Sequence, residues 1–276
     1  MSAVPGIIFA HYNNLFKKYH KLSLSILKEF GFGVNRVMET RILNEVESLN
    51  EELLNLNGRP FDPKWPVTFS TANVVLSIAL GRNFQQSLPK DHASLVESTI
   101  ECVVNMDLVL NMAPIVRFLP VYSKKVNCMR SSSERLLNTI EVGIDFVKST
   151  DSDPSYIRRF LEIQGTSYDH QDLIFVVRDL IFAGTETVST SVQWAMLELA
   201  NHPEVLTRLQ REIDEIVPRD RYPSLDDKPH LPYTEAFILE VMRRHTVVPF
   251  YGPHAPLRDT KLLEYDLPKD CMVGIY

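Results

Sequence analysis

One long helical segment constrains the fold of this chain more than any other feature. Apolar residues recur at helical spacing from Asp169, a plausible N-cap, to about Asn201. These roughly 31 residues would span about 46 Å at 1.5 Å per residue, which is the width of a large domain. From Leu173 to Ala183 the segment is apolar on every face except at Arg178 and Asp179. We therefore expect it to run through the interior of a mainly α-helical protein.

Most of the remaining chain also has helical periodicity. Pro60, Pro63 and Pro66 predict a connector without helix. The stretch from Thr246 to Tyr276 is rich in Val, Pro, Tyr and Leu and predicts short strands, with a turn at Pro268 to Asp270. No internal repeat and no convincing linker divides the chain, so residues 1–276 are expected to form a single domain. The other predicted helices are Val37–Leu56, Thr68–Leu80, His92–Asn111, Glu134–Val147, Pro203–Val217 and Tyr233–Arg244.

Charge and cysteine content exclude several classes of protein. The chain carries 35 acidic and 29 basic side chains, a formal charge of -6, so no overall positive field favours nucleic acid or an anionic membrane surface. Cys102, Cys128 and Cys271 lack the spacing of a zinc site or a disulfide framework, and we expect free thiols. No uncharged apolar stretch of about 20 residues occurs, and the first residues do not resemble a signal peptide. Taken literally, this sequence predicts a soluble chain.

The middle of the long helix carries a small, polar patch, Ala183-Gly184-Thr185-Glu186-Thr187. Glycine destabilises a helix by roughly 1 kcal/mol relative to alanine, and burial of an unpartnered carboxylate is costly. Gly184 would let a bulky group approach the backbone, while Thr185 and Thr187 could divert hydrogen bonds and open the helix locally. An acid and a hydroxyl beside water are the parts of a proton relay. The alternative is a helix crossing, in which Gly184 admits a second helix and Glu186 pairs with a basic side chain.

Two further groups of residues follow the long helix. Glu240 and Arg243 are three residues apart on one helix face and can pair, although such pairs are usually exposed and weak. Val247 to Tyr251 is apolar and stiffened by proline, which suits the wall of a cavity better than a surface loop. The segment leads to His254. A single histidine is more often a satisfied structural residue than a ligand, so it defines no site alone.

In this order and at these separations, the three groups resemble the second half of a cytochrome P-450. FAGTETVSTSVQWAMLELANHPEV, from Phe182 to Val205, is similar to the family's oxygen-activating helix and the helix after it. PYTEAFILEVMRR, from Pro232 to Arg244, is similar to the helix that carries Glu-x-x-Arg. Upstream matches resemble the microsomal class that oxidises drugs, steroids and fatty acids: Gly6–Ala10, Leu22–Gly33, Asn57–Pro63, Asn73–Phe84 and Val116–Pro120. The resemblance implies a mainly α, partial cytochrome P-450 fold, a helical bundle around one long central helix with a few short β-strands near the C-terminus.

The resemblance also implies roles for the polar patch. Glu186 and Thr187 match the acid and the alcohol that deliver protons to iron-bound dioxygen, and would be the catalytic residues. The implied cofactor is haem b, with Gly184 and Ala183 lying against it. His254 matches a residue that donates a hydrogen bond to a haem propionate in this class.

Structural and substrate-contacting roles follow from the same resemblance. Glu240 and Arg243 match a buried ion pair that braces the haem-binding loop. The implied partners are an NADPH-dependent reductase and a small apolar substrate, and the implied location is the membrane of the endoplasmic reticulum. The residues that match substrate-contacting positions are Asp179, Phe182, Val247, Val248, Phe250 and Tyr251.

This sequence departs from the family pattern in two places. The family's Trp-x-x-x-Arg, whose basic residue reaches a propionate, falls on Phe16 and His20, so His20 stands at a cofactor-binding position. The family's Phe-x-x-Gly-x-Arg-x-Cys-x-Gly loop has no counterpart before Tyr276, and Cys271 lies in a predicted strand without such a loop. We therefore expect an internal fragment, with the axial cysteine, the membrane anchor and the first helices outside it, and no metal ligand within it.

Two functions stay open from the sequence. The first is a haem-dependent monooxygenase that inserts one atom of dioxygen into a fatty acid, steroid or xenobiotic, with these 276 residues inactive by themselves. The second is a non-catalytic helical pseudo-enzyme that binds a lipid or a protein partner. An unrelated helical scaffold would require the order of the motifs to be coincidental.

Overall fold

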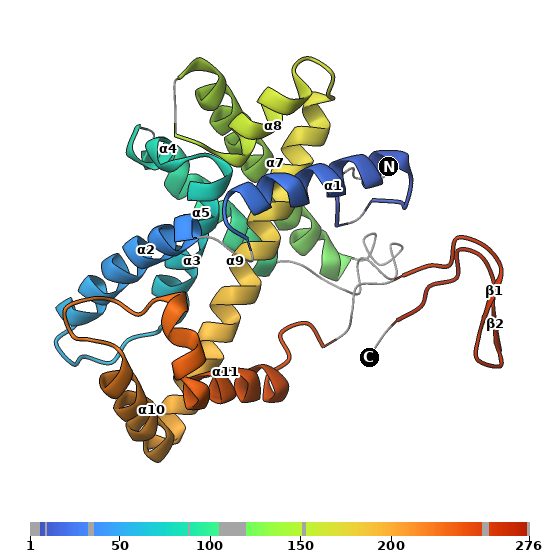
Figure 1. The fold of residues 1–276 in the computed structure, drawn as a ribbon. Coiled ribbons are helices and arrows are strands. Elements are labelled where there is room, and N and C mark those ends of the chain that lie inside the picture. Colours follow the sequence, from blue (N-terminus) through green and yellow to red (C-terminus); the bar gives the residue numbers. More distant parts are fainter. Residues whose placement is uncertain are drawn as a thin grey trace.

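The predicted central helix is present as α9, whose 32 residues run without interruption from His170 to Asn201. Asp169 caps it as expected, because its side chain accepts a hydrogen bond from the Gln171 amide at 2.8 Å. The computed structural model describes residues 6–8, 10–32, 36–87, 89–104, 120–150, 153–249 and 254–274. In Figure 1, α9 passes through the middle of the molecule and the other helices gather around it. The mainly α fold class with one long central helix is confirmed.

The predicted helices follow one another in the expected order, whereas the helices at Asn14–Glu29 and Arg82–Ser87 were not predicted from periodicity. The C-terminal helices agree with the sequence to within a residue or two at most boundaries, and a short 3₁₀ helix, η2 (Leu225–His230), lies between the last two. The remaining helices are α1 (Asn14–Glu29), α2 (Arg36–Asn55), α3 (Lys64–Ala79), α4 (Arg82–Ser87), α5 (Pro89–Val104), α7 (Pro120–Ser149), α8 (Tyr156–Gln164), α10 (Pro203–Ile216) and α11 (Pro232–Arg244).

Some helix boundaries differ from the prediction for identifiable reasons. Helix α3 begins at Lys64, so Pro66 lies inside its first turn, where a backbone amide has no intrahelical partner and proline is tolerated. Helix α7 begins at Pro120 and not near Glu134, since proline is also acceptable at a first helical position. The predicted helix His92–Asn111 extends past Val104 into residues outside the described ranges.

Helix α8 was not predicted at all. It has nine residues, which is too short for periodicity to be informative. Its start is nevertheless defined by an N-cap, because the Ser155 side chain accepts a hydrogen bond from the Arg158 amide at 3.2 Å. Tyr156, Ile157 and Phe160 are fully buried, so packing stabilises this helix more than its own sequence preference does.

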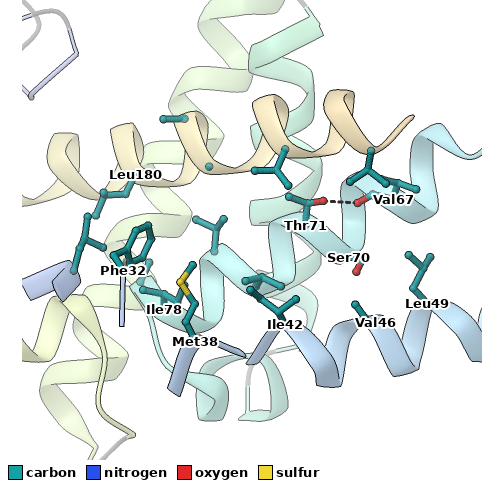
Figure 2. A pocket seen from close by; sticks show the side chains of 18 residues that line it. Phe32, Met38, Ile42, Val46, Leu49, Val67, Ser70, Thr71, Ile78 and Leu180 are labelled. Carbon is teal, nitrogen blue, oxygen red and sulfur yellow. Dashed lines mark hydrogen bonds between the residues drawn. The ribbon is translucent and has the colours of Figure 1, made fainter. Parts of the chain in front are cut away.

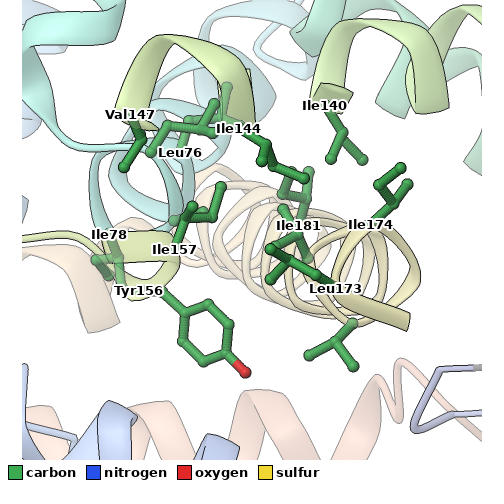
Figure 3. Packing of buried hydrophobic residues seen from close by; sticks show 14 of the residues in the cluster. Leu76, Ile78, Ile140, Ile144, Val147, Tyr156, Ile157, Leu173, Ile174 and Ile181 are labelled. Carbon is green, nitrogen blue, oxygen red and sulfur yellow. The ribbon is translucent and has the colours of Figure 1, made fainter. Parts of the chain in front are cut away.

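The hydrophobic core lies where α3, α7, α8 and the first half of α9 meet (Figure 3). Leu173, Ile174 and Ile181 project from α9 towards side chains of the other three helices. Their partners in Figure 3 include Leu76 of α3 and Ile144 of α7, both buried. The predicted passage of the apolar part of α9 through the interior is confirmed.

A two-stranded hairpin follows the helices. Strands β1 (Thr260–Leu262) and β2 (Tyr265–Leu267) pair antiparallel, with Thr260 opposite Leu267. The Cys271 amide donates to the Pro268 carbonyl at 3.2 Å, which confirms the predicted turn at 268–270. In Figure 1 the hairpin extends away from the helices, and its side chains are mostly exposed.

Candidate functional site

The polar patch of α9 keeps regular helical geometry. The Thr185 hydroxyl donates to the Ile181 carbonyl at 2.7 Å, and the Thr187 hydroxyl donates to the Ala183 carbonyl at 2.8 Å. These are the diverted bonds that the sequence predicts, but α9 remains α-helical through residues 183–187. The local opening is therefore absent, because each hydroxyl adds a bond to a carbonyl without breaking the helix.

Gly184 lies at a helix crossing. A Cβ atom at this position would be 2.9 Å from the Cγ2 atom of Val75, which is closer than real Cβ contacts allow. The glycine therefore lets α3 approach the backbone of α9. This is the alternative interpretation of the patch, and its contact with a haem stays a prediction.

Glu186 and Thr187 differ in exposure although they are consecutive. Glu186 is partly buried, and its Oε1 atom accepts a hydrogen bond from the Thr190 hydroxyl at 3.2 Å. The crossing alternative required an ion pair between Glu186 and a basic side chain. Within the described part of the chain, Glu186 forms no such pair. Thr187 and Ala183 are both exposed, one helical turn apart. The predicted acid is thus held by a hydroxyl, and the predicted alcohol is accessible.

Asp179 does not have the surroundings expected of a substrate-contacting residue. Its carboxylate is buried, and Oδ2 accepts hydrogen bonds from the Ile7 and Ile8 amides at 2.6 and 2.9 Å. Oδ1 receives the Arg178 guanidinium at 2.6 Å. Gly6 permits this contact, since a Cβ there would be 2.5 Å from Oδ2. Asp179 therefore anchors residues 6–8 to α9, a role that the sequence did not reveal because the partners are backbone amides far along the chain.

An apolar cavity of about 490 Å³ lies between α2, α3 and α9 (Figure 2). Ala183 and Gly184 belong to its wall, together with Leu180 one turn earlier. Figure 2 shows Ile42 of α2 facing α3 across this space. The wall contains no charged side chain, and its hydroxyl groups belong to Ser70 and Thr71. Such a space favours neutral, apolar occupants.

The remaining predicted substrate contacts are only partly placed. Phe182 is partly buried on α9, and Val247 is partly buried after α11. Val248 is exposed, contrary to the expectation of a cavity wall, because no described element covers it. Phe250 and Tyr251 lie outside the described residues.

The predicted pair of α11 forms, but it is not buried. Two hydrogen bonds join Arg243 to the Glu240 carboxylate, at 2.7 and 2.6 Å. The guanidinium holds the pKa of Glu240 below its ordinary value, and the carboxylate raises the pKa of Arg243. Both side chains are exposed, since Val241 is the buried residue of α11 among those described. The expectation of a buried pair is wrong for this structure, and its bracing role stays a prediction.

The two predicted propionate partners lie outside α9, and both are exposed. His20 is exposed on α1, where its ring stacks on Phe16 at 5.4 Å between centroids. His254 is exposed and forms an isolated antiparallel bridge, with its amide donating to the Val273 carbonyl at 3.0 Å. The role of each histidine towards a propionate stays a prediction.

A haem would require an apolar wall and a protein ligand for its iron. Helix α9 offers the wall, because Ala183 is small and exposed and the cavity beside it is apolar. Cys128 is exposed on α7 and Cys271 follows the hairpin, and neither lines that cavity. No cluster of metal-ligating side chains occurs among the described residues. These residues fit one face of a haem and place no thiolate beside it.

One cluster near the end of α9 was missed by the sequence. Trp194 and Glu198 contact His245, which follows α11, through a ring stack and a hydrogen bond. The sequence offered a partial signal, since Glu198 and His202 are four residues apart and can pair. The contact with His245 spans 47 residues and needed the structure.

Comparisons with known proteins agree on one family. The family model described as Cytochrome P450 matches residues 2–276. Rat Cytochrome P450 2U1 is 29% identical over 283 residues, covering 97% of this chain and 53% of its own length. Rat Cytochrome P450 2J3 is 32% identical over 288 residues, covering 97% of this chain and 55% of its own length. A solved zebrafish cytochrome P450 with progesterone superposes with a TM-score of 0.83 at 27% identity, covering 98% of this chain and 63% of that one.

A helical bundle around α9, with its patch of small and hydroxyl side chains, thus defines a cytochrome P450 fold. The chain belongs to the cytochrome P450 family. It spans about half the length of the curated relatives that it matches. None of the described helices is both long and apolar enough to cross a membrane.

Proposed function

We propose that this chain forms the oxygen-facing and substrate-facing part of a haem-dependent monooxygenase for apolar organic substrates. The observation that carries the proposal is the exposed pair Ala183 and Thr187 on α9, beside the partly buried Glu186. Membership of the cytochrome P450 family supports haem as the cofactor. A haem held by a thiolate would supply the activation of dioxygen.

The α9 side chains would hold and move protons in this function. The Thr187 hydroxyl donates its hydrogen to the Ala183 carbonyl, so its oxygen lone pairs can accept a hydrogen bond on the exposed side. Glu186, one residue earlier, can replenish a proton through water while Thr190 orients its carboxylate. The apolar wall formed by Leu180, Ala183 and Gly184 would exclude water from the cavity beside the patch.

Substrate, partner and location are the finer parts of the proposal. The apolar lining beside α9 supports a small, neutral substrate such as a fatty acid, a steroid or a xenobiotic. The zebrafish relative solved with progesterone supports a steroid-like size and polarity. By analogy with the microsomal relatives, we propose electrons from an NADPH-dependent reductase and a site on the endoplasmic reticulum membrane.

A chimera tests the proposal. The regions of rat Cytochrome P450 2J3 outside the match are joined to this chain, and haem binding is measured from the carbon-monoxide difference spectrum. We expect a thiolate-type spectrum and oxidation of an apolar substrate. Thr187→Ala should raise the peroxide formed per NADPH consumed by roughly 10-fold or more, as removal of a proton-transfer group predicts. Thr187→Ser is the matched control and should stay coupled, and unchanged coupling in Thr187→Ala would contradict the assignment.

A second candidate is binding of an apolar ligand without chemistry. It is supported by the cavity of about 490 Å³ and by the lack of a thiolate beside it among the described residues. To test this candidate, the chain without added regions is mixed with haem, and the absorption spectrum of the mixture is recorded with carbon monoxide. A thiolate-type Soret shift would refute this candidate, whereas binding of a neutral apolar probe without any haem uptake would support it.

A further inference from the structure

Three side chains meet where α11 ends against the second half of α9. Trp194 and Glu198 lie one turn apart on α9, and His245 directly follows α11. The imidazole of His245 stacks on the Trp194 indole, with 4.0 Å between ring centroids and 6° between ring planes. Its Nε2 atom shares a hydrogen bond with Glu198 Oε1. We call this group the Trp194–Glu198–His245 clamp.

Two members of the clamp are shielded from water more than the neighbouring His202, whereas the Trp194 side chain is exposed. The side chains of Glu198 and His245 are 12% and 18% exposed, whereas that of His202 is 46% exposed. The Glu198 carboxylate also faces Arg244 Nη1 and His202 Nε2, each at 3.4 Å. The hydrogen bond from His245 is the main cause that holds the pKa of Glu198 below its ordinary value. Glu198 is therefore a carboxylate at neutral pH, placed to stabilise a positive imidazole.

Other titratable groups surround the clamp. His202 Nδ1 lies 3.3 Å from Glu204 of α10. Glu240 of α11 lines a small cavity together with Glu198 and Arg244. The clamp is thus the meeting point of charges from α9, α10 and α11, but His245 alone is stacked on an aromatic ring.

His245 lies where the chain leaves α11. Its amide donates to the Val241 carbonyl at 2.9 Å, which closes the last turn of the helix. The next residues, 246–249, include Val247 and Val248, the predicted substrate contacts. The first turn of α11 is held by Glu212 of α10, which accepts hydrogen bonds from the Tyr233 and Thr234 amides, each at 2.8 Å. The last turn is held at His245. The ring stack and the hydrogen bond fix residue 245 in two directions.

We propose that His245 is a positioning residue, and that the clamp sets where residues 246–249 begin relative to α9. When the imidazole is charged, the ion pair with Glu198 and the cation–π contact with Trp194 both strengthen, so the hold on this segment tightens. This inference rests on the proposed function in one respect, which is that residues 246–249 contact the substrate.

The chain itself allows a spectroscopic test. Trp65 and Trp194 are its two tryptophans, so Trp65→Phe leaves Trp194 as the only indole emitter. A charged imidazole stacked on an indole quenches its emission. We expect Trp194 emission to fall in one transition as the pH is lowered and the imidazole becomes charged. His245→Phe should abolish the transition, because it removes the group that becomes charged against the indole.

A matched control separates the clamp from its surroundings. His202→Asn removes the second histidine that faces Glu198, but it leaves the stacked ring in place, so the transition should persist. A transition that survives in His245→Phe would overturn the clamp.

The positioning role has its own readout. The backbone amide resonance of Val248, three residues beyond His245, should shift with the same pH transition as the Trp194 emission. The shift should be lost in His245→Phe and kept in His202→Asn. An amide resonance of Val248 that does not respond to pH would overturn positioning even if the clamp exists.

The chimera then connects the clamp to substrate. His245→Phe should change the ratio of oxidation products and raise KM with a smaller effect on kcat. An active chimera with unchanged products and KM would also overturn the positioning role. If the chimera has no oxidising activity at all, the proposed function fails, whereas fluorescence and Val248 shifts still decide the clamp.

Discussion

The two halves of α9 belong to one uninterrupted helix but have opposite environments. In the first half, Leu173, Val177 and Ile181 are fully buried against α3, α7 and α8. In the second half, Val188 and Leu197 are 50% and 48% exposed. The polar patch at residues 183–187 lies where one environment gives way to the other.

This difference separates stability from interaction. The first half contributes burial of apolar area, which is the main favourable term in folding. The second half leaves apolar side chains accessible, and such surfaces usually mark contacts with other groups. Trp194 and Glu198 of this half contact the end of α11 through a ring stack and hydrogen bonds. Four predictions test the contrast, from the largest expected effect to the smallest.

The first prediction compares apolar truncation in the two halves. Ile181→Ala should lower the free energy of unfolding by about 3 kcal/mol, because a fully buried side chain leaves a cavity. Val192→Ala, at an exposed position of the second half, should cost less than about 1 kcal/mol. Denaturant titration followed by circular dichroism measures both. Equal losses would contradict the contrast.

The second prediction concerns the buried anchor of the first half. Asp179→Asn should lower the free energy of unfolding by about 2 kcal/mol, because it weakens a buried ion pair and two backbone hydrogen bonds. Asp214→Asn is the control, since this exposed aspartate also pairs with an arginine, Arg219. It should have no measurable effect, and a similar loss in both variants would show that burial is unimportant here.

The third prediction addresses the boundary between the halves. Gly184→Ala should lower the free energy of unfolding by about 1 kcal/mol, because its Cβ would clash with Val75 by more than the helix gains from alanine. Adding Val75→Ala removes the clashing methyl groups and should recover the alanine's helix preference. If Gly184→Ala alone raises the free energy of unfolding, α3 does not approach α9 as closely as described.

The fourth prediction concerns stability at alkaline pH and expects no change at neutral pH. Burial, aided by the nearby Asp172 carboxylate, raises the pKa of Tyr19 to about 12, and burial also raises the pKa of Tyr156. Both groups are neutral in the folded protein below the ordinary tyrosine pKa of 10, so their stabilising contribution is complete there. It is lost as the pH rises from about 10 through the folded-state pKa of about 12.

Alkaline stability measurements check this sign. Tyr19→Phe should reduce the fall in unfolding free energy between pH 10 and pH 12, and tyrosinate absorbance should show Tyr19 ionising late. An unchanged pH dependence in Tyr19→Phe would contradict the burial of its hydroxyl beside α9.

Local features of the fold were predictable because they depend on neighbours in the sequence. The N-cap at Asp169, the length of α9 and the first-turn proline of α10 all follow from helix geometry. The Glu240–Arg243 pair is of the same kind, since three residues separate its members. Helix α8 was not predicted because nine residues carry too little periodicity, although packing stabilises this helix.

Tertiary structure decided what the candidate residues contact. Asp179 matched a substrate-facing position, but its amide partners lie 172 and 171 residues away, and no local pattern reports such a contact. Gly184 was consistent with either a cofactor or a crossing; the approach of Val75 shows the crossing, and the contact with a cofactor stays a prediction. The exposure of the Glu240–Arg243 pair depends likewise on which elements cover α11.

The sequence by itself determined a mainly α chain of the cytochrome P450 family, because helical periodicity, caps and motif spacing are local properties of the polypeptide. The tertiary structure alone decided which half of α9 is covered, which carboxylate is buried and which histidine meets a tryptophan. The physical reason is that burial and long-range contacts arise only when distant segments pack together, and their free energies depend on that packing.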